Sequence, residues 1–271
     1  MKLLHIPPLR HLEVIPSTYD AHMCISHVAA RNPEYAEYYR EKSKRGDFVM
    51  LDTATFEGVE TSTREYADVI DMVQPTEITL PDVYMDADAT VWRSIKFAER
   101  LLTLGAGTLK GLAVVPQGHT YHAYLNSIAR LARIPSVTTV CIIEETMQLY
   151  QTPRRTVISA VRRNFPNLFI HLLGVSDDLQ DLYDPFVLSS VRTCDTSKLI
   201  VWGLNGYSTV PDAESRPPEI PYPGRKTLGG RMEYFQFETQ DAVRVQKAKN
   251  NVKSWEEYLD VWDTRWHHSP A

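Results

Sequence analysis

Carboxylate side chains follow several apolar, β-branched runs of this sequence, at the points where buried strands would end. Asp52 closes the run FVMLD, Asp82 follows EITLP, and Asp195 follows VRTC. A carboxylate directly after an apolar run is costly unless partners satisfy it, and a single case is usually a helix cap or a loop ligand. Several that converge on one face of one fold indicate chemistry instead. Further polar or glycine ends of the same kind are Gln117-Gly118, Glu144-Glu145 and Gly174.

Two kinds of chemistry suit converging carboxylates. Metal-assisted hydrolysis in barrel enzymes commonly uses sets of His and Asp ligands, and the nine histidines form no such set. His27, near the end of the second run, and His171, inside the seventh, are expected to be core or structural residues. Glycosyl transfer instead needs one carboxylate that attacks or stabilises an anomeric carbon and another that moves the proton. An Asp and a Gln nearby can read a purine edge through paired hydrogen bonds.

The apolar runs themselves predict the scaffold that positions these side chains. Eight of them alternate with segments of helical period, which predicts parallel βαβ units. A count of eight favours a closed (β/α)8 TIM barrel over an open doubly wound sheet, and barrel chemistry lies at the C-terminal ends of the strands. No GxGxxG follows the first run, which disfavours dinucleotide binding. The expected strands are 12–15, 22–28, 48–53, 77–83, 111–117, 138–144, 169–175 and 191–196.

Helices are expected between the strands because apolar residues recur there at helical spacing. In the helix at 33–44, Asn32 is the expected N-cap and Pro33 takes the first helical position. The barrel core is expected over residues 1–203. Residues 204–271 are expected to form a Pro/Gly-rich loop and two helices, about 237–250 and 253–266, packed on the barrel within the same domain. The other expected helices are 63–72, 88–104, 120–133, 153–164 and a shorter one within 177–186.

The last helix carries an aromatic stripe at helical spacing. Such a stripe predicts a helix docked on the barrel rather than one that stacks on bases. Its members are Trp255, Tyr258, Leu259, Trp262 and Trp266.

Length, composition and cysteine usage set the outer bounds. The chain has 271 residues, 43% of them hydrophobic and 23% charged, which is typical of one large globular domain or two small ones. The three widely spaced cysteines exclude a disulfide framework and the usual cysteine-rich zinc spacings, so buried free thiols are expected. We find no signal-peptide pattern and no apolar run long enough to span a membrane. A cytoplasmic protein with no membrane partner is expected.

The charge balance is acidic, but basic residues gather in places. A net charge of −5 disfavours a sequence-independent nucleic-acid binder. Local basic clusters can still contact phosphates, although a solvated helix face is the alternative for each of them. The clusters are Arg154, Arg155, Arg162 and Arg163; the basic residues of 244–253; and Arg225, Lys226 and Arg231 in a Gly-rich stretch.

Six segments, taken in order, resemble the motifs of a known family. They are LDTATFEG, EITLPD, VVPQG, CIIEE, HLLGVSDDLQDL and CDTSK. Their order and spacing resemble those of the tRNA-guanine transglycosylase superfamily over residues 45–206. The most specific part is LLGVSDDLQDL, with CD roughly twenty residues after its start. The segment SHVAARNPEYAEYYREKSKRGDFVMLDTATFE is most similar to the phage DNA branch, the DNA 7-deazaguanine transglycosylases.

The resemblance implies a role for each matching residue. Asp195 matches the nucleophile that attacks the anomeric carbon of the sugar, and Asp52 matches the second catalytic Asp, which handles the proton of the base. Asp82 matches the Asp that accepts hydrogen bonds from the purine N1–H and exocyclic amine, with Asp86 as the alternative. Gln117 matches the Gln that binds the base.

Further matches line the base site or hold the nucleic-acid backbone. Gly118 is the close-approach position, Phe56 the stacking aromatic, and Leu173, followed by Gly174, the apolar residue below the base. Glu144 or Glu145 shapes the pocket near the 7-substituent. The residues expected to contact the backbone are Lys198, Arg225, Lys226 and Arg231.

The reaction that the resemblance implies is exchange of guanine in DNA for a 7-deazaguanine, preQ0 above all, through a covalent Asp–glycosyl intermediate without a cofactor. No cysteine follows Asp195, whereas the tRNA enzymes carry a C-terminal CxCxxC…His zinc site, so no zinc is expected. His119 replaces the second Gly of the family's VQGG, Ala54-Thr55 replaces a Gly-Gly, and TSKL replaces MPTR. The alternatives are a tRNA-guanine transglycosylase, a TIM-barrel hydrolase of a small glycoside or ester, and an inactive nucleic-acid-binding relative.

Overall fold

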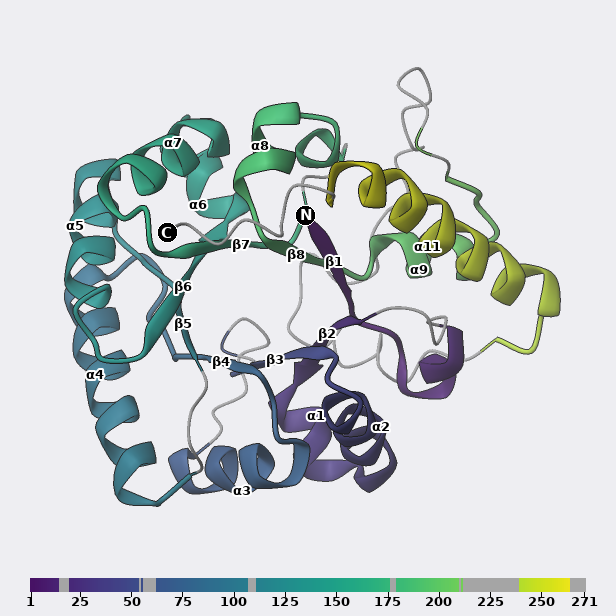
Figure 1. Ribbon diagram of the computed structural model, residues 1–271, viewed down its shortest axis with the longest axis horizontal. Coiled ribbons are helices and arrows are strands. Elements are labelled where there is room, and N and C mark those ends of the chain that lie inside the picture. Colours follow the sequence, from purple (N-terminus) through teal and green to yellow (C-terminus); the bar gives the residue numbers. More distant parts are fainter. Residues whose placement is uncertain are drawn as a thin grey trace.

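Eight parallel strands close into a barrel in their order along the chain, and β1 pairs with both β2 and β8 (Figure 1). The computed structural model describes residues 1–14, 20–53, 55, 62–106, 111–175, 179–209, 211 and 239–263. Helices surround the ring of strands, so the predicted (β/α)8 fold is confirmed. The strands are β1 Lys2–His5, β2 Ala21–Ile25, β3 Phe48–Asp52, β4 Glu77–Thr79, β5 Leu112–Val114, β6 Val137–Ile143, β7 Phe169–Leu173 and β8 Thr193–Thr196.

Local sequence signals explain where many helices begin. Ser62, Asp86 and Thr120 each accept a hydrogen bond from the backbone N–H three residues on, and Pro33 takes the first turn of α2 as predicted. Asp86 is therefore a helix cap. No described helix has the length and apolarity needed to cross a membrane. The helices are α1 Ser26–Arg31, α2 Pro33–Lys44, α3 Thr63–Val73, α4 Ala87–Thr103, α5 Tyr121–Leu131, α6 Glu144–Leu149, α7 Arg154–Asn164, α8 Pro185–Ser190, α9 Lys198–Leu204 and α11 Ala242–Asp263, with 3-10 turns η1 Leu9–Val14 and η3 Gln180–Leu182.

The first strand differs from the prediction. It is Lys2–His5 rather than 12–15, and the chain over Leu9–Val14 forms a 3-10 turn with a kink at His11. The four-residue strand is short and begins with a lysine, so its sequence shows little pattern. Pairing with β8, which sets Leu4 opposite Asp195, makes it a strand, because its leucines are then fully buried.

The C-terminal part also differs, because a single helix, α11, replaces the two that were predicted. The pair Asn250-Asn251 looks like a helix break in the sequence. The amide of Asn251 is buried and donates to the carbonyls of Leu199 and Tyr207, while its oxygen accepts from Thr209 N–H. These contacts compensate its poor helix propensity. The helix packs beside α9 and β1 (Figure 1) with Trp255 and Leu259 buried, as the aromatic stripe predicted.

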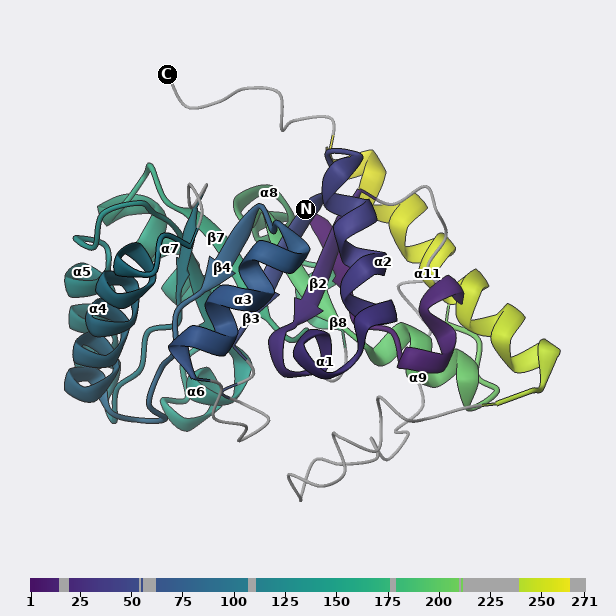
Figure 2. The same ribbon diagram turned by 90° about the horizontal axis from the view of Figure 1, so that it is seen from below.

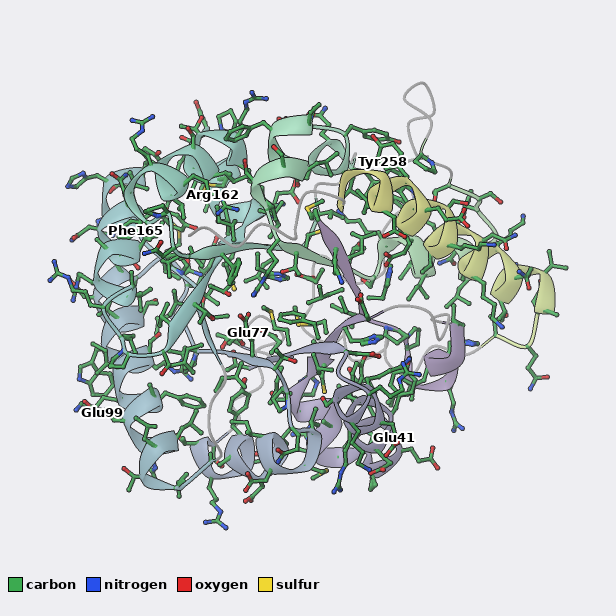
Figure 3. The ribbon with its side chains drawn as sticks, viewed as in Figure 1. Glu41, Glu77, Glu99, Arg162, Phe165 and Tyr258 are labelled. Atoms are coloured by element: carbon green, nitrogen blue, oxygen red, sulfur yellow. The ribbon has the colours of Figure 1, made fainter. Side chains whose placement is uncertain are left out.

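The N-terminal end of the barrel is filled by an ion pair between aromatic rings. Arg192 donates to the carboxylate of Glu77, which points into the ring of strands in Figure 3. The guanidinium lies over the rings of Phe48 and Phe169, 4.8 and 4.3 Å from their centroids. Three of these residues are the first of their strands, so this end is a packed plug.

The cysteines behave as their spacing predicts. Cys24, Cys141 and Cys194 are all free and all buried in the barrel strands. They act as small hydrophobic side chains of the core.

Candidate active site

The predicted chemical groups come together at the C-terminal ends of the strands. Asp52 is the last residue of β3, Asp195 is the last but one of β8, and Asp82 and Gln117 follow β4 and β5 by three residues. Parallel strands in a closed barrel all end on the same side. In Figure 2, the helices α1, α6 and α9, which follow their strands directly, lie toward that side.

Two groups contact the same oxygen of Asp195. Its Oδ1 accepts from the backbone N–H of Gly174 at 2.9 Å and lies 3.2 Å from Nε2 of His171. The other ring nitrogen of His171 lies 2.9 Å from the hydroxyl of Thr193. All three side chains are buried. Contacts from Gly174 and His171 to the same oxygen hold the carboxylate of Asp195 in one orientation.

His171 is fully buried, as expected of a core residue, and it also contacts the predicted nucleophile, a contact that the sequence interpretation did not anticipate. The alternation of side chains along β7 and β8 explains this contact. His171 lies opposite Thr193 in the register of β7 and β8, and Asp195 lies two residues further along β8, on the same face.

The turn after β7 has the backbone geometry that presents the Gly174 N–H. Gly174 has a φ of +68°, a left-handed conformation that favours glycine. Arg154 fixes this turn, because its guanidinium donates to the carbonyls of Leu173 and Gly174 and pairs with Asp181 at 2.6 Å. Arg154 is buried, so it is neither the solvated residue nor the phosphate contact that its basic cluster indicated.

Asp82 and Gln117 form a buried carboxylate–amide pair. Gln117 Nε2 donates to Asp82 Oδ2 at 2.6 Å, and its Oε1 accepts from the N–H of Met85 at 3.2 Å. Burial raises the pKa of Asp82 from 3.8 to about 6; the hydrogen bond from Gln117 opposes the rise, and the charge of Asp52 adds to it. Asp52 itself accepts from the hydroxyl of Thr79 at 3.0 Å.

Cys141 is a buried thiol of β6 inside the barrel. Burial raises the pKa of this β6 thiol well above its usual range, and the charges of Glu77, Asp52 and Asp195 add to the rise. The thiol therefore lies in the field of both predicted catalytic carboxylates.

The position of Gly118 leaves no room for a side chain, because the backbone of helix α5 lies against it. A Cβ on Gly118 would lie 2.6 Å from the backbone nitrogen of Tyr124 in α5. The carbonyl of Gly118 accepts from the hydroxyl of Tyr150. This close approach to the protein fixes the turn that carries Gln117, and a contact of Gly118 with a base stays a prediction.

The remaining predicted residues fall into two groups. Leu173 ends β7, Glu144 begins α6, and Lys198 begins α9, all three half-buried at this end of the barrel. The ammonium of Lys198 donates to the carbonyl of Val175 at 2.6 Å, and its contact with phosphate stays a prediction. The residues or side chains that lie outside the described part are Phe56, the side chain of Glu145, Arg225, Lys226 and Arg231.

Fold and site together define a (β/α)8-barrel protein that holds Asp52, Asp82, Asp195 and Gln117 at its C-terminal end. No protein-family model matches the chain, and no curated protein matches it either. Over the described ranges, no three His, Cys, Asp or Glu side chains are grouped so that they could hold a metal ion. The expectation that the protein binds no zinc stays a prediction.

Proposed function

We propose that the chain is a transglycosylase that exchanges guanine in DNA for a 7-deazaguanine base, 7-cyano-7-deazaguanine (preQ0) in particular. The observation that carries the proposal is the Asp82–Gln117 pair at the same end of the barrel as Asp52 and Asp195. The pair suits a purine edge, and the two other carboxylates suit the bond between base and sugar.

The hydrogen-bonding groups of the pair are complementary to guanine. Guanine and its 7-deaza analogues present N1–H and the exocyclic amine as donors, with O6 as an acceptor beside them. An ionised Asp82 can accept from both donors, and the amide of Gln117 can donate to O6. The 2.6 Å hydrogen bond between the two side chains keeps them side by side before the base arrives.

In the first displacement, Asp195 attacks C1′ of the deoxyribose while the bond from C1′ to the guanine nitrogen breaks. The electron pair of that bond leaves with guanine, which takes up the proton that Asp52 carries at the start of the cycle and regains in the second displacement. The sugar is then an ester of Asp195, with inversion at C1′. The target base must leave the stack to reach the barrel end, as in other enzymes that act on a base.

The second displacement reverses these changes with a different base. The 7-deazaguanine attacks C1′ through its ring nitrogen, which loses its proton to Asp52, and the ester bond to Asp195 breaks. Two inversions retain the original configuration. One glycosidic bond replaces another, so the exchange needs no energy source. DNA is favoured as the polymer by the similarity of residues 26–57 to the phage DNA enzymes.

The test is incorporation of radiolabelled guanine and of radiolabelled preQ0 into duplex DNA, single-stranded DNA and unmodified tRNA. We expect label in DNA with the wild type and none with Asp195→Ala. The matched control is Asp68→Ala, an exposed residue of α3 that pairs with Arg64 four residues away, and it should retain full activity. Label in tRNA alone would replace DNA by tRNA as the substrate. No label in any polymer, from a folded protein, would refute the proposal.

A further inference from the structure

We infer that His171 and Thr193 position Asp195 for attack, by holding one of its carboxylate oxygens and leaving the other to react. The inference rests on the proposed function, because it assigns a role in that reaction. The residues act through Asp195 and are positioning residues rather than catalytic ones.

The two oxygens of Asp195 have different surroundings. Oδ1 accepts from Gly174 N–H at 2.9 Å and lies 3.2 Å from His171 Nε2. Both contacts therefore reach one oxygen, and among the described residues no hydrogen bond to Oδ2 of Asp195 is seen. A carboxylate with one oxygen anchored by two donors has a fixed plane, so the second oxygen has a fixed position. Oδ2 is therefore the attacking oxygen.

The contact with Thr193 sets which nitrogen of His171 carries the proton. An ionised carboxylate can only accept, so Nε2 must be protonated to donate to Asp195. The Nδ1 atom is then an acceptor in the neutral ring, and the hydroxyl of Thr193, 2.9 Å away, is the group that can donate to it. The hydroxyl thus holds the ring in the Nε2–H form, as a partner of the second nitrogen commonly does for histidine.

The surroundings make this arrangement rigid. His171 is completely buried and Thr193 is 2% exposed, so water does not compete for these hydrogen bonds. Both residues lie on strands and are directly opposite each other in the register of β7 and β8. Groups on strands hold a reacting atom more precisely than groups on loops.

Other buried histidine–carboxylate pairs in the protein do different work. His5 contacts Glu256 of α11 at 2.7 Å, and His22 contacts Asp47 in the turn before β3 at 3.2 Å. These pairs connect the barrel strands to a helix and a turn around them. The His171 pair differs because its carboxylate belongs to the neighbouring strand, at the reactive end of the barrel.

The kinetic test uses matched substitutions of Thr193. Thr193→Val keeps the shape and removes the hydroxyl, whereas Thr193→Ser keeps the hydroxyl. Using labelled guanine exchange, we expect Thr193→Val to lower kcat by up to about 100-fold with KM for guanine unchanged, since misplacement of a reacting group costs rate. Thr193→Ser should stay near the wild type. His171→Gln, whose amide can donate from the place of Nε2, should retain more activity than His171→Phe. Equal kcat for Thr193→Val and the wild type would overturn the inference.

A measurement without substrate separates this inference from the proposed function. In protein labelled with 15N-histidine, a long-range 1H–15N correlation spectrum reports which ring nitrogen is protonated, and His171→Gln assigns the signal. We expect the Nε2–H form in the wild type and a change in Thr193→Val. Any other form in the wild type overturns the inference even if exchange occurs. The Nε2–H form in a wild type that exchanges no base overturns the proposed function, and the positioning role with it.

Discussion

Replacing Asp82 by Asn should stabilise the protein at neutral and higher pH. Burial raises the pKa of Asp82 from 3.8 to about 6, so ionising the carboxylate costs more in the folded chain than in the unfolded chain. At about 1.4 kcal/mol per pH unit, the cost above pH 6 is about 3 kcal/mol. Asn cannot ionise and still accepts from Gln117, so Asp82→Asn should gain up to about 3 kcal/mol at pH 8.

The sign of the pH dependence follows from the same difference in pKa. Because the folded pKa is the higher one, the cost is fully present above about pH 6 and disappears as the pH falls toward 3.8. At pH 4 the variant should therefore exceed the wild type by less than about 1 kcal/mol. The difference in stability between the two proteins is the quantity to measure. Burial lowers the pKa of His22 and His27 from 6.5 to about 4, so both histidines make each protein less stable as the pH falls, which is opposite to the effect of Asp82.

The assay is urea unfolding of both proteins at pH 8 and pH 4, followed by circular dichroism. Asp86→Asn is the control from the same turn, because this exposed residue caps α4 and Asn caps equally well. It should change the free energy of unfolding by less than about 0.5 kcal/mol at either pH. A gain for Asp82→Asn that is the same at both pH values, or a loss at pH 8, would refute the reasoning from burial.

Four further predictions concern separate parts of the molecule. The KM for guanine should rise as the pH falls below about 6, because a protonated Asp82 cannot accept from both donors of the base; initial rates of exchange measure this. Burial, with the charge of Lys42, lowers the pKa of His22 from 6.5 to about 4. The wild type should therefore lose stability as the pH falls from 6.5 to 4, and His22→Gln should lose less, which thermal unfolding across this range measures. Arg154→Met should cost about 3–5 kcal/mol in urea unfolding, because it removes the ion-pair partner of the buried Asp181 and two hydrogen bonds to the turn after β7. Adding Asp181→Asn should restore part of that stability, whereas no restoration would contradict the role of the pair. Gly118→Ala should cost about 1–3 kcal/mol, because its Cβ would lie 2.6 Å from Tyr124 N; an unchanged urea midpoint would contradict the contact.

The sequence alone was sufficient to predict the barrel and the place of most candidate residues. Seven of the eight apolar runs in the sequence contain or overlap a strand of the barrel, and their alternation with helices leaves little choice of architecture. Once the fold is a parallel barrel, a residue just after a strand must lie at one known end. Asp52, Asp82, Gln117 and Asp195 could therefore be placed together without coordinates.

Only the tertiary structure decided how these residues are held. Arg154 looks like its exposed neighbours in sequence, but it is buried because the turn after β7 and Asp181 supply its partners. His171 contacts Asp195 because of the register between β7 and β8. Asn251 continues a helix because its partners lie 42 to 52 residues away. Hydrophobic pattern is a local property, whereas the satisfaction of a buried polar group depends on which distant segments fold against it.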